Sequence, residues 1–109
     1  MTMLGKIIVT TAHMEFLLCP TLFVGITDDG ATIYVRYRWG RLSIRIDSRD
    51  PAPNGGAEGR QIYAEKLDPT GLDGAMSYEE LREITADWID WPDELSRKTY
   101  DDDDIIDIN

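Results

Sequence analysis

Regular alternation of apolar and polar residues runs from Ala31 to Asp47 and constrains the fold more than any other feature of the chain. Before Gly40, one face of the alternation carries Ile33, Val35, Tyr37 and Trp39. After Gly40, the period resumes with Leu42, Ile44 and Ile46. A period of two is typical of a strand with one buried face. The segment therefore predicts two strands that form a hairpin turning near Trp39-Gly40.

Further strand and turn signals lie on both sides of this hairpin. Lys6 to Ala12 and Thr21 to Thr27 are rich in β-branched and apolar residues and predict two more strands, while Arg60 to Leu67 predicts an edge strand. Asp28-Asp29-Gly30 has turn chemistry, so the strands before and after it should form a hairpin. The Pro- and Gly-containing segment from Ser48 to Gly59 is expected to be a mobile loop.

The strongest helix signal begins at Ser77. Ser77-Tyr78-Glu79-Glu80 matches a capping box, in which the Ser hydroxyl and the Glu80 carboxylate satisfy backbone amides of the first turn. Apolar residues then recur at helical spacing, namely Leu81, Ile84, Trp88 and Trp91, with Thr85 beside them. We predict an amphipathic helix from Ser77 to Trp91 that Pro92 ends, and a second short helix within Asp93 to Tyr100.

These elements predict an α+β fold, with a small antiparallel sheet of about four to five strands and a C-terminal amphipathic helix. A chain of 109 residues suits one core, so residues 1–100 are expected to form one domain and residues 101–109 an acidic tail. Cys19, as the only cysteine, excludes an intramolecular disulfide and suits a reducing compartment. We recognise no secretion signal and no apolar run of membrane-spanning length, so we expect a cytoplasmic protein.

Charge is distributed unevenly along the chain. Residues 1–67 contain 8 Lys/Arg and 7 Asp/Glu, whereas residues 68–109 contain 3 and 14, giving formal charges of +1 and −11 within the total of −10. A field of one sign attracts cationic surfaces and repels nucleic acid and anionic lipid. The expected partner is therefore a basic protein surface, and neither direct binding of nucleic acid nor membrane binding is expected. The oligomeric state is left open.

Candidate partner-binding residues follow from the acidic part. Glu80, Glu83, Asp87 and Asp90 fall at i, i+3, i+7 and i+10, which would place four carboxylates along about 15 Å of one helical face. Such a face either binds a cationic partner or is simply solvated. Trp91, beside Pro92, is a candidate exposed anchor. The tail adds Asp101, Asp102, Asp103 and Asp104, followed by isoleucines that suit either a partner's groove or a return onto the parent domain.

An arginine cluster offers an alternative site. Arg36, Arg38, Arg41 and Arg45 share one face of the predicted hairpin with Tyr34 nearby. Forked guanidinium donors bind phosphate or carboxylate and stack on rings. Three interpretations stay open: the arginines pair internally with the acidic helix or tail, they bind an anionic small ligand or partner, or they are exposed to solvent.

Catalytic and metal-binding patterns are not found. His13 and Cys19 are the only residues of their types and supply too few ligands for a zinc site, and the contiguous aspartates lack the alternating ligands and glycine of a calcium loop. The glycine-rich Asn54 to Gly59 does not have nucleotide-loop spacing. We expect no enzymatic activity, no catalytic residue, no metal and no cofactor.

In its layout, with a small sheet, an acidic helix from Ser77 to Trp91 and the tail from Asp101 to Asp107, the chain resembles small acidic phage-encoded accessory proteins. Several of those inhibit host proteins by presenting carboxylates where nucleic acid would bind. The resemblance implies a non-catalytic inhibitor that presents a DNA-like acidic face to the basic groove of a nucleic-acid-binding host protein. The alternatives are a binding protein for an anionic ligand or nucleotide and a self-associating accessory protein.

Overall fold

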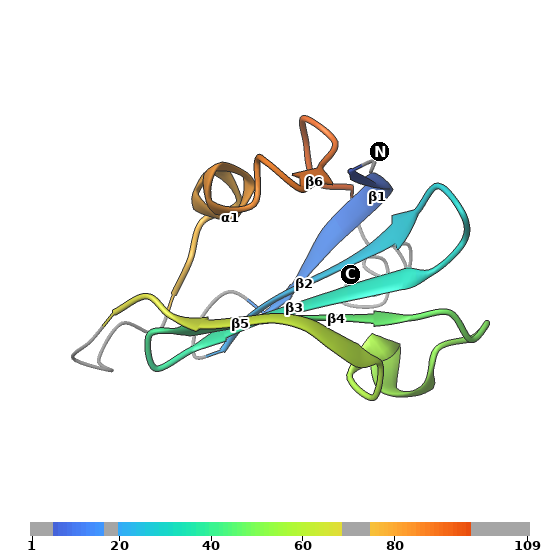
Figure 1. Cartoon of the computed structure of the whole chain (residues 1–109), viewed down its shortest axis with the longest axis horizontal. Helices are drawn as coiled ribbons and strands as arrows, with labels where there is room; N and C mark the ends of the chain where they lie inside the picture. The colour runs from blue at the N-terminus through green and yellow to red at the C-terminus, as the bar shows by residue number, and fades with distance from the viewer. Residues whose placement is uncertain (1–5, 17–19, 69–74, 97–109) are drawn as a thin grey trace, which may run out of the picture.

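The computed structural model describes residues 6–16, 20–68 and 75–96, which form one curled sheet with a helix on one side (Figure 1). The elements, in chain order, are β1 (Ile7–Phe16), β2 (Thr21–Thr27), β3 (Thr32–Arg38), β4 (Arg41–Asp47), the 3-10 helix η1 (Pro53–Gly56), β5 (Arg60–Lys66), α1 (Tyr78–Ile84) and β6 (Ile89–Asp90). The sheet order is β5-β4-β3-β2-β1-β6. All pairs are antiparallel except β6, which runs parallel to β1.

The α+β class is confirmed, but the expected four to five strands are too few. The sheet has six strands in the described ranges and curls into a half-barrel, and β6 comes from a segment that we predicted to be helical. The strand after residue 59 lies at one edge of the sheet, as predicted. Within the same ranges, no helix has the length and apolar character needed to cross a membrane.

Both predicted hairpins are confirmed. In the first, Gly30 has φ 88° and the amide of Thr27 donates to the carbonyl of Ala31 at 2.9 Å, which closes the turn between β2 and β3. In the second, Trp39 (φ 55°) and Gly40 (φ 77°) connect β3 to β4. Two consecutive residues with positive φ make the primed turn whose twist matches that of the flanking strands. Trp39 is therefore a turn residue, half exposed, and does not lie on the apolar face that its sequence position predicted.

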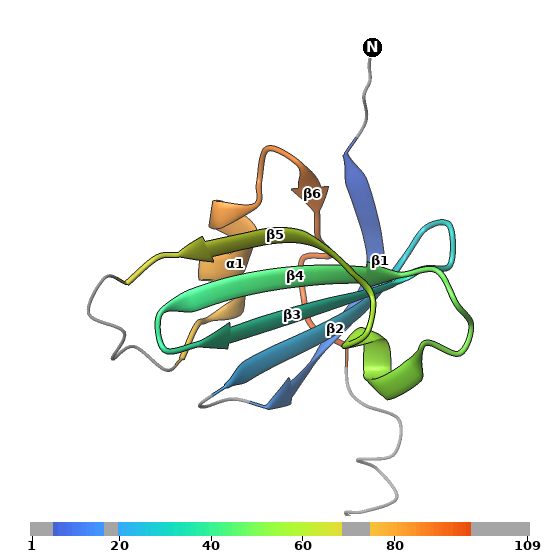
Figure 2. The same ribbon diagram turned by 60° about the horizontal axis from the view of Figure 1, so that its bottom comes forward.

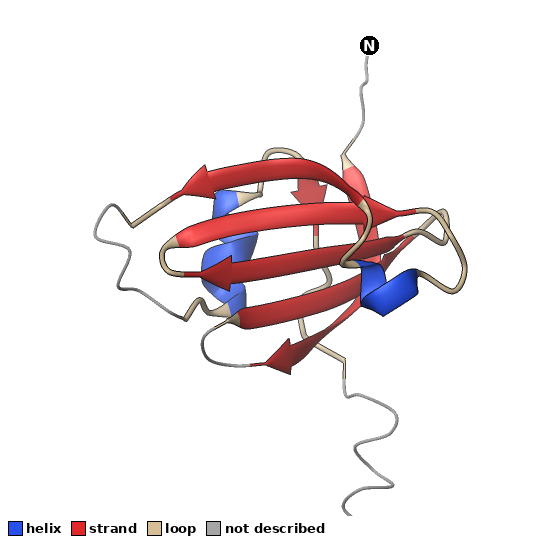
Figure 3. Ribbon diagram, turned by 90° about the horizontal axis from the view of Figure 1, so that it is seen from below, coloured by secondary structure: helices blue, strands red, loops and turns tan. Residues whose placement is uncertain are grey.

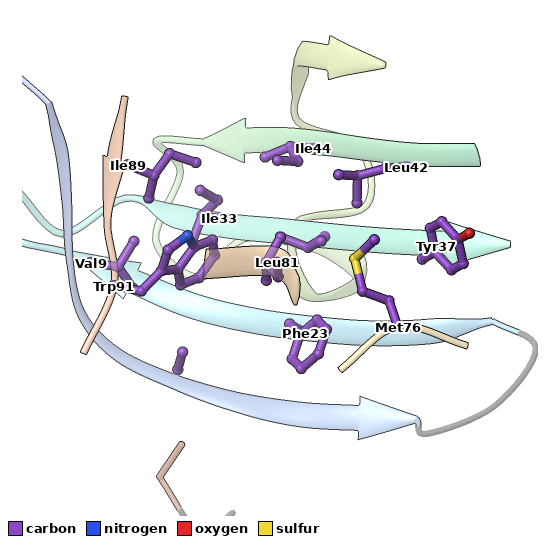
Figure 4. Packing of buried hydrophobic residues seen from close by; sticks show 12 residues of the cluster. Val9, Phe23, Ile33, Tyr37, Leu42, Ile44, Met76, Leu81, Ile89 and Trp91 are labelled. Atoms are coloured by element: carbon purple, nitrogen blue, oxygen red, sulfur yellow. The ribbon is translucent and has the colours of Figure 1, made fainter. Parts of the chain in front are cut away.

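The hydrophobic core lies on the face of the sheet that carries the odd-numbered residues of β2 and β3. Phe23, Ile33 and Val35 are fully buried there, and Leu81 of α1 packs against them (Figure 4). The cluster is completed by Val9, Ala12, Tyr37, Leu42, Ile44, Met76, Ile89 and Trp91. Alternation in β2, β3 and β4 thus determines which side of the sheet α1 covers.

The start of the helix is confirmed. The hydroxyl of Ser77 accepts from the amide of Glu80 at 3.1 Å, and the Glu80 carboxylate accepts from the amide of Ser77 at 2.9 Å, so both halves of the capping box are present. These bonds satisfy amides that have no partner inside the helix. The carboxylate of Glu80 is therefore used within the fold.

The end of the helix was predicted wrongly. α1 stops at Ile84, Thr85 leaves helical geometry, and Ile89 and Asp90 pair with Ile7 and Ile8 of β1. Unpaired backbone groups on the outer edge of β1 compete for this segment, and the paired strand buries Ile89, while the helix prediction counted only local spacing. Trp91 is buried, but Ile84 is 37% exposed. Asp93 to Ser96 contains no helix, and residues 97–100 lie outside the described ranges.

The segment from Ser48 to Gly59 packs against the sheet and is not the loose loop that its composition predicted. Gly56 is buried, and a Cβ there would lie 3.0 Å from the Thr32 side chain and 3.3 Å from Tyr34 Cβ. Figures 2 and 3 show η1 on one side of the sheet and α1 on the other. Close approach of the backbone therefore requires glycine at position 56 and places η1 on the face opposite the core.

Asp47 fixes the beginning of this segment. Its buried carboxylate accepts from the backbone amide of Arg49 at 3.0 Å and from the Arg49 guanidinium at 2.9 and 2.7 Å. These hydrogen bonds lower the pKa of Asp47 below its ordinary value. The pair ties the chain leaving β4 to the end of the sheet beside η1.

We expect Thr85→Val to destabilise the protein by about 1–3 kcal/mol, the usual cost of leaving a buried polar group without a partner. Thr85 is fully buried; its hydroxyl donates to the Leu81 carbonyl at 2.8 Å and accepts from the Trp91 indole nitrogen at 2.8 Å. Urea unfolding measures the loss. Thr85→Ser, which keeps the hydroxyl, is the control and should lose less stability; an equal loss would mean that packing matters more than the hydrogen bonds.

Candidate functional site

The face of the sheet opposite α1 carries the arginine cluster. β3 contributes Tyr34, Arg36 and Arg38 and β4 contributes Arg41, Ser43 and Arg45, a set that we call the arginine face. In register, Arg38 lies opposite Arg41, Arg36 opposite Ser43, and Tyr34 opposite Arg45. Paired residues in an antiparallel sheet share a face, so the cluster follows directly from hairpin register.

A shallow hollow of about 390 Å³ lies over the arginine face. Its lining consists of the six residues of that face together with Ala57 and Gln61. Ala57 follows η1 and Gln61 lies on β5, so the end of the 48–59 segment and the strand after it contribute to the wall. Same-face residues on one strand are about 7 Å apart and neighbouring strands about 4.8 Å, which brings the four guanidinium groups around one ligand-sized space.

The arginines of this face differ in how they are held. Arg45 donates to the Gly59 carbonyl at 3.0 Å and to the Gln61 side chain at 3.4 Å, and is thereby fixed beside β5. Arg38 lies over the Trp39 ring at 5.4 Å from its centroid. Among the residues that the structure describes, Arg36, Arg38 and Arg41 have no carboxylate partner. Their donors are therefore available to an anion.

The interpretation in which these arginines pair with the acidic helix is wrong, because the sheet separates the two (Figure 3). Several acidic residues outside α1 bind elsewhere: Asp47 binds Arg49, Glu58 accepts from the Asn54 side chain, and Glu15 contacts His13 at 2.5 Å. Asp68 lies beside the turn between β3 and β4, where its amide donates to the Gly40 carbonyl at 3.1 Å. Pairing with the tail concerns Asp101 to Asp104, which lie outside the described residues.

The predicted row of four carboxylates on one helical face does not form. Glu80 belongs to the capping box, Glu83 is on α1, Asp87 lies in the turn after it, and Asp90 is on β6. Trp91 is 5% exposed and gives its indole hydrogen to Thr85, so it is a core residue and offers no exposed anchor. The helix was expected to continue to Trp91, and its end at Ile84 removes the common face.

A second hollow, of about 410 Å³, lies between α1 and β6. Glu79, Glu83 and Asp90 line it, together with Lys6, Arg82, Ala86, Ile89 and Trp91. The Arg82 guanidinium donates to the backbone carbonyl and to a carboxylate oxygen of Asp93, both at 3.2 Å. It also lies 5.8 Å from the centre of the Tyr78 ring. The carboxylates in this hollow therefore come from both α1 and β6, and the cations Lys6 and Arg82 lie in the same hollow.

Tyr78 connects this acidic side to the core. Its hydroxyl donates to the carbonyl of Pro92 at 2.5 Å, and its ring packs against Phe23 and Trp91. Burial raises the pKa of Tyr78 to about 12, so it is neutral at physiological pH. Its role is to hold the segment after β6 against α1.

Apolar side chains flank the arginine face on β1 and β2. Phe16 is 60% exposed and pairs with Leu22, which in turn pairs with Arg36, so these three share one side of the sheet. Ile26 is also exposed. His13 lies on β1, as a strand residue, whereas Cys19 lies outside the described residues. The exposed sheet face is thus apolar on β2 and at Phe16 of β1, carries Thr11 and His13 elsewhere on β1, and is basic on β3 and β4.

Trp39 is the functional candidate that sequence reasoning missed. A bulky side chain at φ 55° costs roughly 1 kcal/mol, and its ring is half exposed, so burial returns only part of that cost. The sequence contained a sign of this strain, because Trp39-Gly40 occupies a predicted two-residue hairpin turn in which Asn-Gly is favoured. Ala57 and Gln61 had no such signal, because only tertiary packing brings them to the hollow.

Comparisons of the chain with protein families, with curated proteins and with solved structures found no match. The two hollows and their residues are therefore interpreted from chemistry alone.

We expect Trp39→Asn to stabilise the protein by about 0.5–1 kcal/mol, because asparagine tolerates positive φ and precedes glycine in favoured hairpin turns. Thermal or urea unfolding measures the gain. Trp39→Ala is the control: it removes the ring but keeps the unfavourable backbone geometry, and should show no gain. A less stable Trp39→Asn protein would mean that contacts of the ring outweigh the strain.

Proposed function

We propose that this protein binds an anionic ligand through its arginine face and performs no catalysis. The observation that carries the proposal is that Arg36, Arg38 and Arg41 surround one hollow with no carboxylate partner among the described residues. Arginine presents planar, forked donors that match phosphate and carboxylate oxygens. A phosphate-bearing small ligand such as a nucleotide suits this donor set.

Like-charge pairing supports this proposal. Arg38 and Arg41 lie directly opposite each other across β3 and β4, and Arg41 also pairs with Lys66 of β5. Like charges directly opposite in a sheet are destabilising, by a few tenths to about 1 kcal/mol. An anion bound between them replaces this repulsion with attraction. The free protein therefore carries an electrostatic cost that a ligand removes.

A planar group on the ligand has surfaces to contact. Trp39 and Tyr34 lie at opposite ends of the basic strip, and Trp39 already receives the Arg38 guanidinium over its ring. Aromatic rings and arginine planes both stack on nucleobases. This combination favours a nucleotide over a simple inorganic anion.

The overall charge of −10 does not exclude an anionic ligand. The helix α1 lies on the side of the sheet away from η1 and the arginine face (Figure 3), and Asp90 lies on the edge strand β6, which β2 and β1 separate from β3. Packed layers are about 10 Å apart and neighbouring strands about 4.8 Å, so these carboxylates are about 10 Å or more from the arginine face. The Debye length at physiological salt is about 8 Å, so their field at the hollow is largely screened. Contacts within the hollow are then dominated by the arginines.

Binding without proton transfer fits the residues present. Arginine stays protonated at physiological pH, so the face supplies charge and hydrogen bonds and cannot act as a general base. His13, the only histidine, is bonded to Glu15 on β1 and does not line the hollow. A ligand held here is retained unchanged.

The acidic hollow favours a second candidate function, capture of a basic protein surface. Glu79, Glu83 and Asp90 converge there from α1 and β6 over an apolar lining that includes Ala86. A lysine or arginine side chain of a partner has an apolar stem and a charged head that would suit such a site. In this proposal the protein acts as an inhibitor of a nucleic-acid-binding partner. The acidic hollow would bind that partner through three carboxylates, whereas the row predicted on one helical face had four.

Replacing both Arg36 and Arg41 with glutamine should lower nucleotide affinity at least tenfold, because a charge-assisted hydrogen bond contributes about 1.5–3 kcal/mol and 1.4 kcal/mol is a factor of ten. Calorimetric titration with ATP and with pyrophosphate at low and moderate salt measures the change. Arg60→Gln, an exposed charge outside this hollow, is the matched control and should bind like wild type. Absence of binding or thermal stabilisation by any nucleotide or phosphate in folded wild type contradicts the proposal.

For the second candidate, the Glu83→Gln, Asp90→Asn double variant should lose captured partners from a cytoplasmic lysate, and capture by wild type should weaken as salt rises. Asp87→Asn removes an exposed charge that does not line the hollow and is the control. If wild type and the double variant retain the same proteins, the acidic side is only solvated.

A further inference from the structure

One end of the sheet brings together segments that are far apart in the sequence. Because neighbouring strands from β1 to β5 are antiparallel, the start of β1, the turn between β2 and β3, the end of β4 and the start of β5 all lie at this end. A hollow of about 480 Å³ lies among them, and we call it the end hollow. It shares no lining residue with the hollow over the arginine face, so it is a separate site.

The apolar part of the end hollow is a place where the core approaches solvent. Ile7, Ile46, Ile62 and Trp88 line it, and each packs against the core while being only partly buried. The Trp88 ring also packs against Tyr63 of β5, with 5.3 Å between the ring centroids. The segment before β6 therefore meets β5 across the curl of the sheet (Figure 1). Both margins of the sheet thus contribute apolar surface to the hollow, and the mouths of β-barrels are common positions for ligand sites.

Charged side chains also line the end hollow, two of each sign: Lys6, Arg60, Asp28 and Asp29. Asp29 belongs to the turn, because its carboxylate accepts from the Thr27 hydroxyl at 2.5 Å, a bond that lowers its pKa. Lys6 is shared with the acidic hollow. Within residues 6–16, 20–68 and 75–96, neither Arg60 nor Asp28 forms an ion pair. One cation and one carboxylate are therefore available to a ligand.

These two charges are too far apart to neutralise each other directly. Arg60 pairs with Ile46, which pairs with Ile33 on β3. The partner of Ile33 on β2 lies two residues before Thr27, and Asp28 follows Thr27. On a flat sheet, three strands and two residues separate the backbones of Arg60 and Thr27 by about 16 Å. The curl of the sheet and the long arginine side chain shorten the gap between the charges, and two or three extended residues cover about 7–11 Å.

We propose that the end hollow binds a short peptide of apolar residues with free termini, its carboxylate at Arg60 and its ammonium group at Asp28. A ligand with only one charge would leave one of these two side chains without a partner, whereas a zwitterion satisfies both. The apolar lining receives the side chains of the peptide, and about 480 Å³ lies within the range of small-molecule pockets. This site is additional to the arginine face and does not depend on the function proposed for that face.

The first test measures which charges the ligand needs. Leucyl-leucine, its N-acetylated form and its C-terminal amide are titrated into the full chain, and the backbone amide signals are followed by NMR. We expect saturable shifts in residues 27–31 and at Ile46 and Ile62. Each blocked form should bind about threefold more weakly than leucyl-leucine, because each loses one exposed charge pair. Free leucine, with both charges on one carbon, should bind more weakly than the dipeptide.

The second test matches each charge of the protein with a charge of the peptide. Arg60→Gln should weaken leucyl-leucine about threefold and leave the affinity for the C-terminal amide unchanged, because that form has no carboxylate. Asp28→Asn should do the same for leucyl-leucine and leave the N-acetylated form unchanged. Lys66→Gln, an exposed cation near the other end of β5, and Glu94→Gln, an exposed carboxylate, do not line the hollow and are the matched controls.

Four outcomes would overturn the inference. Absence of saturable shifts at the end hollow with millimolar dipeptide removes the site, and shifts confined to the arginine face place the peptide elsewhere. Equal affinity for the dipeptide and its two blocked forms would mean an apolar site without recognition of the termini. Free leucine binding as tightly as leucyl-leucine would make a single amino acid the ligand. None of these results bears on whether a nucleotide binds the arginine face, so the two proposals fail separately.

Discussion

Burial of a single face of the sheet determines the rest of this structure. The described chain has one α-helix, α1, and Leu81 of that helix packs on the same face as Phe23 and Ile33. Apolar residues on alternate positions of β2, β3 and β4 decide which face this is. Among the described residues only η1 covers part of the opposite face, at one end, so whatever the alternate positions carry becomes the accessible surface of the described fold. On β3 and β4 they carry arginine.

The end of α1 has a similar influence on the acidic side. Thr85 is buried where the helix ends, and it links the Leu81 carbonyl to the Trp91 indole through its hydroxyl. The chain can then run beside β1 and pair Ile89 with Ile7. This short parallel pair places Asp90 across a hollow from Glu83 instead of on one helical row with it. A local hydrogen-bonded unit thus determines how the carboxylates are grouped.

Features set by neighbouring residues were predictable, and features set by distant contacts were not. Alternation around Gly40, turn chemistry at Gly30 and the capping box at Ser77 each depend on a few consecutive residues, and all three are confirmed. The helix was extended too far because spacing in residues 85–91 contains no information about the free edge of β1. The grouping of the four arginines on one face was predicted, since register fixes it, whereas the packing of η1 beside them depends on tertiary contact at Gly56.

The arginines and the carboxylates of α1 lie on opposite sides of the sheet, and this separation changes how the formal net charge of −10 should be interpreted. At low ionic strength, where the Debye length reaches about 30 Å, an approaching anion first meets the net field of the molecule, which is repulsive. Within the hollow it meets guanidinium groups at hydrogen-bond range. Added salt screens the distant repulsion, which speeds encounter, and also weakens the contacts, which speeds release. The salt dependence of affinity and that of association rate therefore have opposite signs for a ligand of the arginine face. For a cationic partner of the acidic hollow, attraction acts at both ranges, so salt slows encounter and weakens the complex together. The sign of the salt effect on association thus distinguishes the two faces.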